Sequence, residues 1–182
     1  MKKIFVHFAE GFEEIEAITP VDVLRRAGCE VSMVSVTGNR MVTSSRNITV
    51  QTDFLFDEVD YKKADMLVLP GGMPGSKNLD QHEGLKNKLL EADRQGKWLA
   101  AICAAPMVFG HLGLLQGRKA TCYPGNEKDL VGATATGKAV EIDQNFITAK
   151  GAGSSIKFSL TLVEVLLGKE KALDIKSKMM VE

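Results

Sequence analysis

Short runs of apolar, β-branched residues alternate along this chain with longer segments of helical periodicity, and Gly, Pro or Asp marks most changes between them. The pattern predicts strands at 2–9, 30–36, 64–72, 97–102, 119–124 and 139–151, a hairpin at 40–54, and helices at 10–28, 76–95, 105–115, 154–168 and 169–180. Strands that alternate with helices form parallel βαβ units. We therefore expect an α/β fold in which a doubly wound, mostly parallel sheet carries helices on both faces.

Pro20 lies inside the first predicted helix, and Thr19 and Asp22 on either side of it fit a capping-box pattern. Because proline removes a backbone N–H from the helix interior, we expect a kink or a restart at this point. Gly28 should end the helix.

Composition limits the classes of protein that this chain can represent. The 182 residues are 45% hydrophobic, which is enough for one domain, 1–182, with its own core. The 23 basic and 23 acidic residues cancel without a local basic run, so no nucleic-acid partner is expected. No apolar segment is long enough to cross a bilayer, and we find no signal peptide. Cys29, Cys103 and Cys122 are widely spaced and odd in number, which fits neither disulfides nor a zinc site and indicates a reducing cytoplasm.

Ligands of doubly wound sheets bind beyond the carboxyl ends of the strands. Three turns that follow predicted strands should meet there: "AEGFEEIE", "LPGGMPG" and the turn that carries Cys103. In "LAAICAAP" a strand, one cysteine and a helix with Pro106 in its first turn follow one another directly. A cysteine at such a junction lies at the positive end of a helix, which favours the thiolate. The alternative is a buried structural cysteine.

The other two turns give weaker signals. The paired glycines of "LPGGMPGS", residues 69–76, could aim backbone N–H groups at an oxyanion or could form only a turn. Glu10, Glu13, Glu14 and Glu16 form an acidic cluster that would ordinarily be a solvated first turn of a helix. One of the four could face the pocket, but spacing does not select it, even with Ile15 and Ile18 taken as the buried stripe.

A cysteine hydrolase needs a histidine base, and the sequence offers only three histidines. His7 lies within the first predicted strand and His82 on a predicted exposed helix. His111 follows Cys103 by two helical turns, roughly 12 Å along the axis. We expect none of them to be the partner of Cys103.

The segments "EGFEEIEA", "VDVLRRAG", "SSRN", "VLPGGMPGSKNL", "AAICAAP" and "GAGSS" stand in the order and spacing of the ThiJ/PfpI superfamily. Over nearly its whole length the chain resembles the parkinsonism-associated DJ-1 branch of that superfamily. The resemblance implies a flavodoxin-like α/β sandwich, a homodimer and a small pocket that needs no cofactor and no metal.

The resemblance also implies roles for single residues. It places the family's reactive cysteine at Cys103, and it selects Glu16 as the carboxylate that hydrogen-bonds this cysteine. The implied backbone donors are Gly72 and Ala104. The other implied pocket residues are Gly71, Tyr123, Arg26 and Arg46, the two arginines lying near the dimer interface in relatives.

Two departures from family patterns bear on the activity. Protease-like and amidotransferase-like members carry a histidine directly after the cysteine or further downstream, and here Ala104 follows. Members of the DJ-1 branch often carry "T-x-H-P", whereas this chain reads "TCYP" with Tyr123 in the histidine's place. Relatives with the histidine are described as glyoxalases and deglycases of methylglyoxal or its thiol and amine adducts. A tyrosine can donate a hydrogen bond but is a poor proton shuttle near neutrality.

Two classes of function therefore remain. One is a cofactor-free glyoxalase or deglycase that acts on small α-oxoaldehydes or glycated thiols and amines, slowed by Tyr123. The other is a redox-responsive stress protein or chaperone in which Cys103 is oxidised. A cysteine peptidase or amidotransferase is less favoured, and so is the thiazole monophosphate biosynthesis label that some members bear.

Overall fold

The computed structural model describes residues 1–182, and its centre is a seven-stranded sheet. In spatial order the strands are β10 (Val140–Asp143), β11 (Phe146–Ala149), β7 (Trp98–Ile102), β6 (Met66–Leu69), β1 (Lys3–Phe8), β2 (Glu30–Ser35) and β5 (Phe54–Leu55). All neighbours are parallel except β10 and β11, which form an antiparallel hairpin. The predicted doubly wound, mostly parallel sheet is confirmed.

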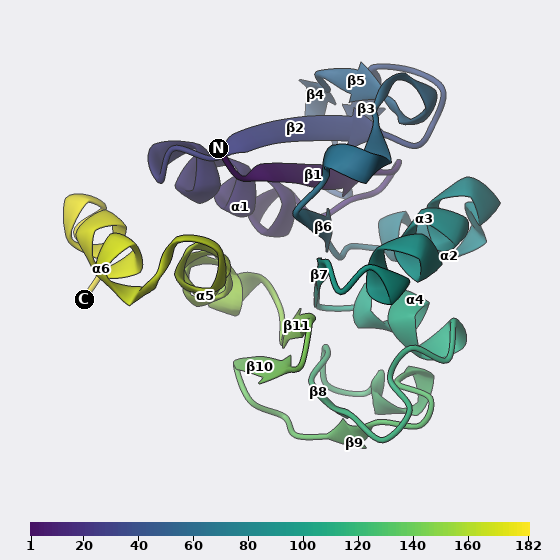
Figure 1. Ribbon diagram of the computed structural model, residues 1–182. Helices are drawn as coiled ribbons and strands as arrows, with labels where there is room; N and C mark the ends of the chain where they lie inside the picture. Colours follow the sequence, from purple (N-terminus) through teal and green to yellow (C-terminus); the bar gives the residue numbers. More distant parts are fainter.

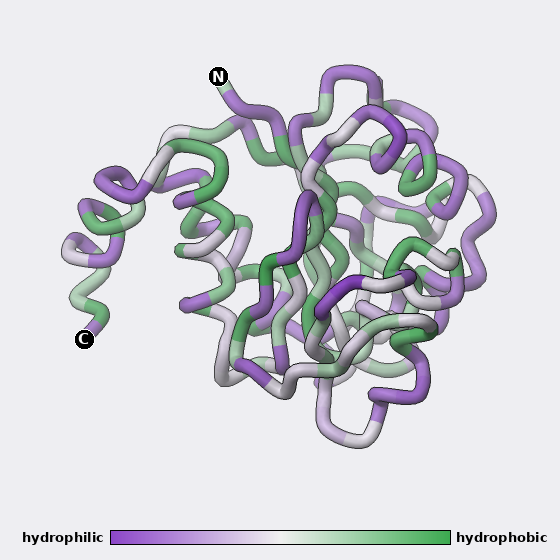
Figure 2. The backbone as a smooth tube through the Cα atoms, turned by 60° about the horizontal axis from the view of Figure 1, so that its bottom comes forward, coloured by the Kyte–Doolittle hydropathy of each residue, from purple (hydrophilic) through white to green (hydrophobic).

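Helices cover both faces of the sheet (Figure 1). One face carries α1 (Glu14–Arg26) and α5 (Ser155–Leu167), with α6 (Lys169–Lys178) packed on α5. The other carries α2 (Gly75–Gln81), α3 (Glu83–Arg94) and α4 (Pro106–His111). Successive residues of a strand point to opposite faces, so Val68 of β6 packs toward α1 and α5 whereas Leu67 packs toward α3. Each central strand therefore contributes side chains to two hydrophobic cores, one on either face of the sheet, which explains why these strands are almost continuously apolar. Figure 2 shows this distribution, with a green centre and more hydrophilic outer loops.

The order in which the chain adds strands to the sheet changes direction at β1, and the carboxyl ends of the strands beside this point form one edge of the sheet. From central β1 the chain runs outward through β2 on one side, and then through β6, β7 and β11 on the other. Four neighbouring parallel strands therefore end at the same edge, and the segments that directly follow them carry Glu16 in the first turn of α1, Gly71, Cys103 and Ala152. Ligands of such sheets bind at this kind of edge.

Two expectations about helices are wrong. The segment 76–95 is not one helix, because His82 ends α2 and begins α3, where its Nδ1 accepts a hydrogen bond from the Leu85 N–H at 2.9 Å. The expected restart at Pro20 is absent, because the first helix runs without interruption from Glu14 and is capped by Glu13 instead of Thr19.

The remaining differences concern short elements. The predicted hairpin exists as β3 (Met41–Thr43) and β4 (Thr49–Gln51), but β5 after it joins the main sheet. The predicted strand at 119–124 is reduced to β8 (Lys119–Ala120), which pairs with β9 (Thr134–Ala135) outside the main sheet. Four single-turn helices complete the chain: η1 (Phe56–Glu58), η2 (Tyr61–Lys63), η3 (Glu127–Asp129) and η4 (Ala152–Ser154). No helix combines the length and the apolar character that crossing a membrane requires.

Candidate active site

Cys103 occupies a sharp turn between β7, which ends at Ile102, and α4, which begins at Pro106. Its φ of 66° is in the left-handed region, which costs a non-glycine residue roughly 1–2 kcal/mol. Backbone hydrogen bonds hold the turn: the Cys103 N–H donates to Ala149 O at 2.9 Å, and the Tyr123 N–H donates to Cys103 O at 2.8 Å. The elbow that the sequence predicts is present, and Cys103 is partly exposed instead of filling the core.

Glu16 is the one glutamate of the acidic cluster whose side chain turns into the protein, where it is 1% exposed. Its neighbours in the cluster have other partners. Glu13 caps the helix by accepting the Glu16 N–H at 2.8 Å, and Glu14 accepts the Arg46 N–H at 2.9 Å. Ile15 is 53% exposed and Ile18 is 38% exposed, so the expectation that they mark the buried stripe is wrong.

The paired glycines Gly71 and Gly72 bring the loop after β6 against the Glu16 carboxyl and the Cys103 side chain. The Gly71 N–H donates to Glu16 Oε2 at 3.0 Å. A side chain on Gly71 would clash with that carboxyl oxygen and would come within 2.6 Å of Cys103 Cβ. Gly72 has a φ of 91°, and its backbone N–H hydrogen-bonds to the Cys103 sulfur together with the N–H of Ala104. The glycines therefore do more than form a turn, because they permit the approach and supply a donor.

The Glu16 carboxyl and the Cys103 thiol hydrogen-bond to each other, so each group affects the pKa of the other. Burial raises the pKa of Glu16 to about 7, although the thiol and the backbone N–H groups of Gly71 and Ala152 act in the opposite direction. Burial, followed by the charge of Glu16, also raises the pKa of Cys103. The expectation that the helix N-terminus dominates and favours the thiolate is therefore wrong: α4 begins three residues after Cys103 and has only six residues.

The Cys103 pocket has a volume of about 510 Å³ and is open to solvent. Its lining residues are Glu13, Glu16, Ser45, Arg46, Gly72, Met73, Cys103, Ala104, Tyr123, Asn126 and Ala152. Tyr123 is 54% exposed, and a side chain on Gly151 would lie between the Tyr123 ring and Glu16, 3.5 Å from Cδ2 and 4.0 Å from Oε1. The sequence pattern does not select Ser45 or Asn126, because each belongs to a loop whose course the pattern does not determine, and it names Glu13 only as one of four candidate glutamates.

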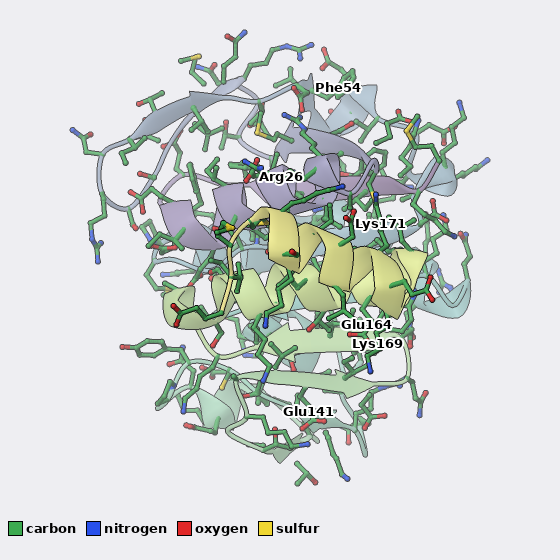
Figure 3. The ribbon with its side chains drawn as sticks, turned by 90° about the vertical axis from the view of Figure 1, so that its left-hand side faces the viewer. Arg26, Phe54, Glu141, Glu164, Lys169 and Lys171 are labelled. Atoms are coloured by element: carbon green, nitrogen blue, oxygen red, sulfur yellow. The ribbon has the colours of Figure 1, made fainter.

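Arg26 does not line this pocket. It lies in the last turn of α1, where its Nε donates to Asp22 Oδ2 at 2.8 Å. Figure 3 shows it on the face that carries α6. Arg46, by contrast, is at the pocket, and its guanidinium makes only one long hydrogen bond, to Ser45 O at 3.3 Å.

None of the histidines lies at the pocket, as expected. His7 is buried, with ring nitrogens 3.2 Å from Val68 O and 3.0 Å from the Tyr61 hydroxyl, and burial lowers its pKa to about 4. His82 caps α3 between two helices instead of lying on a continuous helix face, and His111 pairs with Asp80. His, Cys, Asp and Glu side chains do not gather in threes as a metal site would require.

Residues 2–165, most of the chain, match the model of the DJ-1/PfpI family. The chain belongs to the DJ-1/PfpI family. The structure of oxidized DJ-1 from Toxoplasma gondii superimposes with a TM-score of 0.95 at 38% identity, covering 99% of this chain and 98% of that one. The identity and the coverage extend the relationship to the DJ-1 branch and confirm the fold.

Two relatives of the DJ-1/PfpI family differ in the length that they share with this chain. Protein DJ-1 homolog B of Arabidopsis thaliana is 42% identical over 176 residues, 96% of this chain, and the chain spans 40% of that protein's length. A protein of Pyrococcus abyssi (strain GE5 / Orsay) named as a deglycase is 29% identical over 170 residues, which cover 90% of this chain and 99% of that protein. Family membership therefore points to a DJ-1-like function.

Proposed function

We propose that this protein is a cofactor-free, cysteine-dependent enzyme of the glyoxalase or deglycase type, acting on methylglyoxal or on its thiol and amine adducts. The observation that carries the proposal is the hydrogen-bonded pair of Cys103 and Glu16, with the N–H groups of Gly72 and Ala104 directed at the sulfur. The relationship to the Pyrococcus abyssi protein named as a deglycase supports the same class of chemistry.

The first step uses Cys103 as the nucleophile. The Cys103 thiol gives its proton to the Glu16 carboxylate as its sulfur attacks the aldehyde carbon of methylglyoxal, and the C=O π electrons move to the oxygen, which takes that proton back from Glu16 to give a hemithioacetal. The Gly72 and Ala104 N–H groups lie beside the sulfur, where they can donate to the oxygen that becomes negative.

Glu16 supplies the proton transfers that follow. Its carboxylate removes the proton from the former aldehyde carbon, and the resulting enediol accepts a proton at the adjacent carbon, which leaves a lactoyl thioester on Cys103. Attack by water releases lactate and the thiol, so one methylglyoxal and one water give one lactate. A general acid–base group is most effective when its pKa is near the operating pH, and the pKa of Glu16 is about 7.

The enzymatic proposal is tested by measuring lactate formed from methylglyoxal without added glutathione. Wild type is expected to form lactate, and Cys103→Ser is expected to form none, because the serine hydroxyl is a much weaker nucleophile. Circular dichroism of both proteins controls for folding. Equal lactate formation by the two proteins would exclude Cys103 as the nucleophile.

The second candidate function is redox sensing through Cys103. Cys103 is the partly exposed cysteine, whereas Cys29 and Cys122 are buried. The neighbouring Glu16 carboxyl can hydrogen-bond a sulfinic acid, so mild peroxide should add two oxygens to Cys103 alone. If wild type oxidises in this way but forms no lactate, the redox function becomes the better proposal.

We also propose that the protein is a homodimer in solution. Ile15 and Ile18 on α1 and Ile48 beside β4 are exposed apolar side chains, and an interface would remove them from water. Analytical ultracentrifugation of wild type and Ile15→Glu tests this, since a charge in the interface should shift the protein to monomer.

A further inference from the structure

His111 lies at the contact of three elements, α2, α4 and η3, each of which follows a segment that lines the Cys103 pocket. Its Nδ1 lies 3.0 Å from Asp80 Oδ2, and its Nε2 lies 3.9 Å from Asp129 Oδ1. Figure 1 shows α2, which carries Asp80, beside α4, which ends at His111. Asp129 belongs to η3.

Each of these elements directly follows a part of the pocket. The α2 helix that carries Asp80 follows Gly72 and Met73, and α4 follows Cys103 and Ala104. The η3 turn that carries Asp129 follows Tyr123 and Asn126. One imidazole therefore lies where the three supporting elements converge behind the pocket.

The contact between α4 and η3 is close. A side chain on Gly110 would clash with the carbonyl oxygen of Asp129 and would come within 2.8 Å of Val131 N, so only glycine lets the loop lie against α4 here. Asp80 Oδ1 is buried without a hydrogen-bond partner, which leaves His111 as the hydrogen-bonding partner of the Asp80 carboxyl.

Protonation of His111 decides whether its ring attracts both carboxylates. A neutral imidazole has one N–H donor and one lone pair and carries no charge, and ionised carboxylates only accept hydrogen bonds. The imidazolium donates to Asp80 at 3.0 Å and carries the charge opposite to both partners, so it also attracts Asp129 Oδ1, which at 3.9 Å lies beyond hydrogen-bond distance. Two other charged residues near this contact do not take the place of the His111 imidazolium. Lys86 of α3 interacts with Asp80 through its charge but does not connect it to Asp129, and Glu127 of η3 is acidic and accepts a hydrogen bond from the Gly125 N–H at 2.8 Å.

We propose that His111 is a positioning residue: when protonated it ties the loop that carries Tyr123 and Asn126 to α2 and α4, and when neutral it releases that loop. The pocket wall that Tyr123 and Asn126 form would then respond to the protonation of a residue outside the pocket, in addition to that of Glu16 within it. For its effect on turnover the proposal rests on the proposed enzymatic function, but the movement of the loop does not.

The experiment is an NMR pH titration of the uniformly ¹⁵N-labelled full chain between about pH 5.5 and 8.5, a range that brackets the ordinary pKa of histidine. The backbone amides of Tyr123 and Asn126 are expected to show a shift with the midpoint of the His111 ring, in addition to the shift that follows Glu16, whose carboxyl lines the same pocket with a pKa of about 7. His111→Gln should abolish the shift that follows the His111 ring and leave the one that follows Glu16, and His111→Lys, which keeps the charge, should hold the first of these shifts at its low-pH value. His82→Asn, which keeps a capping side chain on α3, is the matched control and should titrate like wild type.

Turnover provides the second measurement. If methylglyoxal is a substrate, Asp129→Asn should change kcat/KM at low pH by about two- to fivefold, the range expected of a partly exposed ion pair, and should bring it toward the high-pH value. The proposal is overturned if the amides of Tyr123 and Asn126 do not follow His111, or if they titrate unchanged in His111→Gln. Absence of lactate from every protein would count against the enzymatic function only, since the amide titration needs no substrate.

Discussion

The Glu16 carboxyl and the Cys103 thiol hydrogen-bond to each other beside Gly71, where a side chain would clash with the carboxyl and come within 2.6 Å of Cys103 Cβ. Two elements far apart in sequence, the first turn of α1 and the elbow after β7, meet there. The two elements lie near each other because four neighbouring parallel strands end at the same edge of the sheet. The absence of a side chain on Gly71 lets the Glu16 and Cys103 side chains come into contact.

Gly71→Ala should separate the pair. The added methyl group would come within 2.6 Å of Cys103 Cβ and would clash with the Glu16 carboxyl, so one of the two side chains must move. Because a displacement of about 1 Å can cost about a hundredfold in rate, lactate formation should fall by at least that factor. Gly153→Ala is the matched control, since a side chain there meets no atom within 4 Å. Equal activity of the two variants would show that the close approach is not required.

Cys103 should be the only cysteine that reacts quickly with iodoacetamide at neutral pH. The reason is access, because Cys29 is 7% exposed and Cys122 is 5% exposed whereas Cys103 is partly exposed, and burial raises the pKa of all three thiols and so does not distinguish them. Peptide mapping after brief labelling measures each site. Similar labelling of all three cysteines would contradict the placement of Cys103 at the pocket.

The sequence predicts the sheet well because each buried strand is short, apolar and bounded by turn residues. It does not predict the split of α2 from α3, since the leucine spacing continues across His82 and the break depends on a side-chain cap. The sequence also predicts too long a strand at β8. The pattern continues through Thr121 and Cys122, but β8 pairs with its neighbour β9 only at Lys119 and Ala120.

The site is predictable only in part. An elbow at Cys103 follows from a strand, small residues and Pro106 in succession. The inward turn of Glu16 accompanies two contacts that only the folded chain makes: Glu13 caps α1 through the Glu16 N–H, and Glu14 binds the Arg46 N–H of a distant loop. The family resemblance was needed to select Glu16. The sequence pattern predicts a lowered pKa for Cys103, and the structure gives a raised one. A local pattern reveals the nearby helix N-terminus, but it reveals neither the burial of the thiol nor the Glu16 carboxylate beside it.

Glu16 should make stability depend on pH. Burial raises its pKa from 4.5 to about 7, so between these values the folded state binds more protons than the unfolded state and stability falls as the pH rises. Relative to Glu16→Gln, the wild-type free energy of unfolding should decrease by on the order of 3 kcal/mol across this interval. Urea denaturation of both proteins at several pH values measures the difference, and groups common to both, such as His7, cancel. A constant difference would mean that the pKa of Glu16 is not raised.

Glu16→Gln should also separate nucleophilicity from turnover. The amide can still hydrogen-bond the sulfur, and removing the carboxylate removes a charge that raises the pKa of Cys103, so alkylation should be as fast as in wild type or faster. Loss of the base should lower lactate formation by about a hundred- to ten-thousandfold. Unchanged turnover would show that another group removes the proton.

Tyr123→His should raise turnover. Tyr123 lines the pocket, its N–H donates to Cys103 O at 2.8 Å, and its ring lies against Gly151 near Glu16, so a histidine there would bring a group that both donates and accepts protons near neutrality. Its benefit is limited, because Glu16 already supplies a base, so we expect a gain of roughly several-fold, below the roughly hundred- to ten-thousandfold that general acid–base catalysis typically contributes. Tyr123→Phe is the control: it removes only the hydroxyl, and it should be no faster than wild type. Lactate assays at fixed methylglyoxal concentration compare the three proteins. If Tyr123→Phe and Tyr123→His are equally fast, the gain comes from removing the phenol hydroxyl and not from adding a base, and the interpretation of Tyr123 as a catalytically weaker substitute for histidine is wrong.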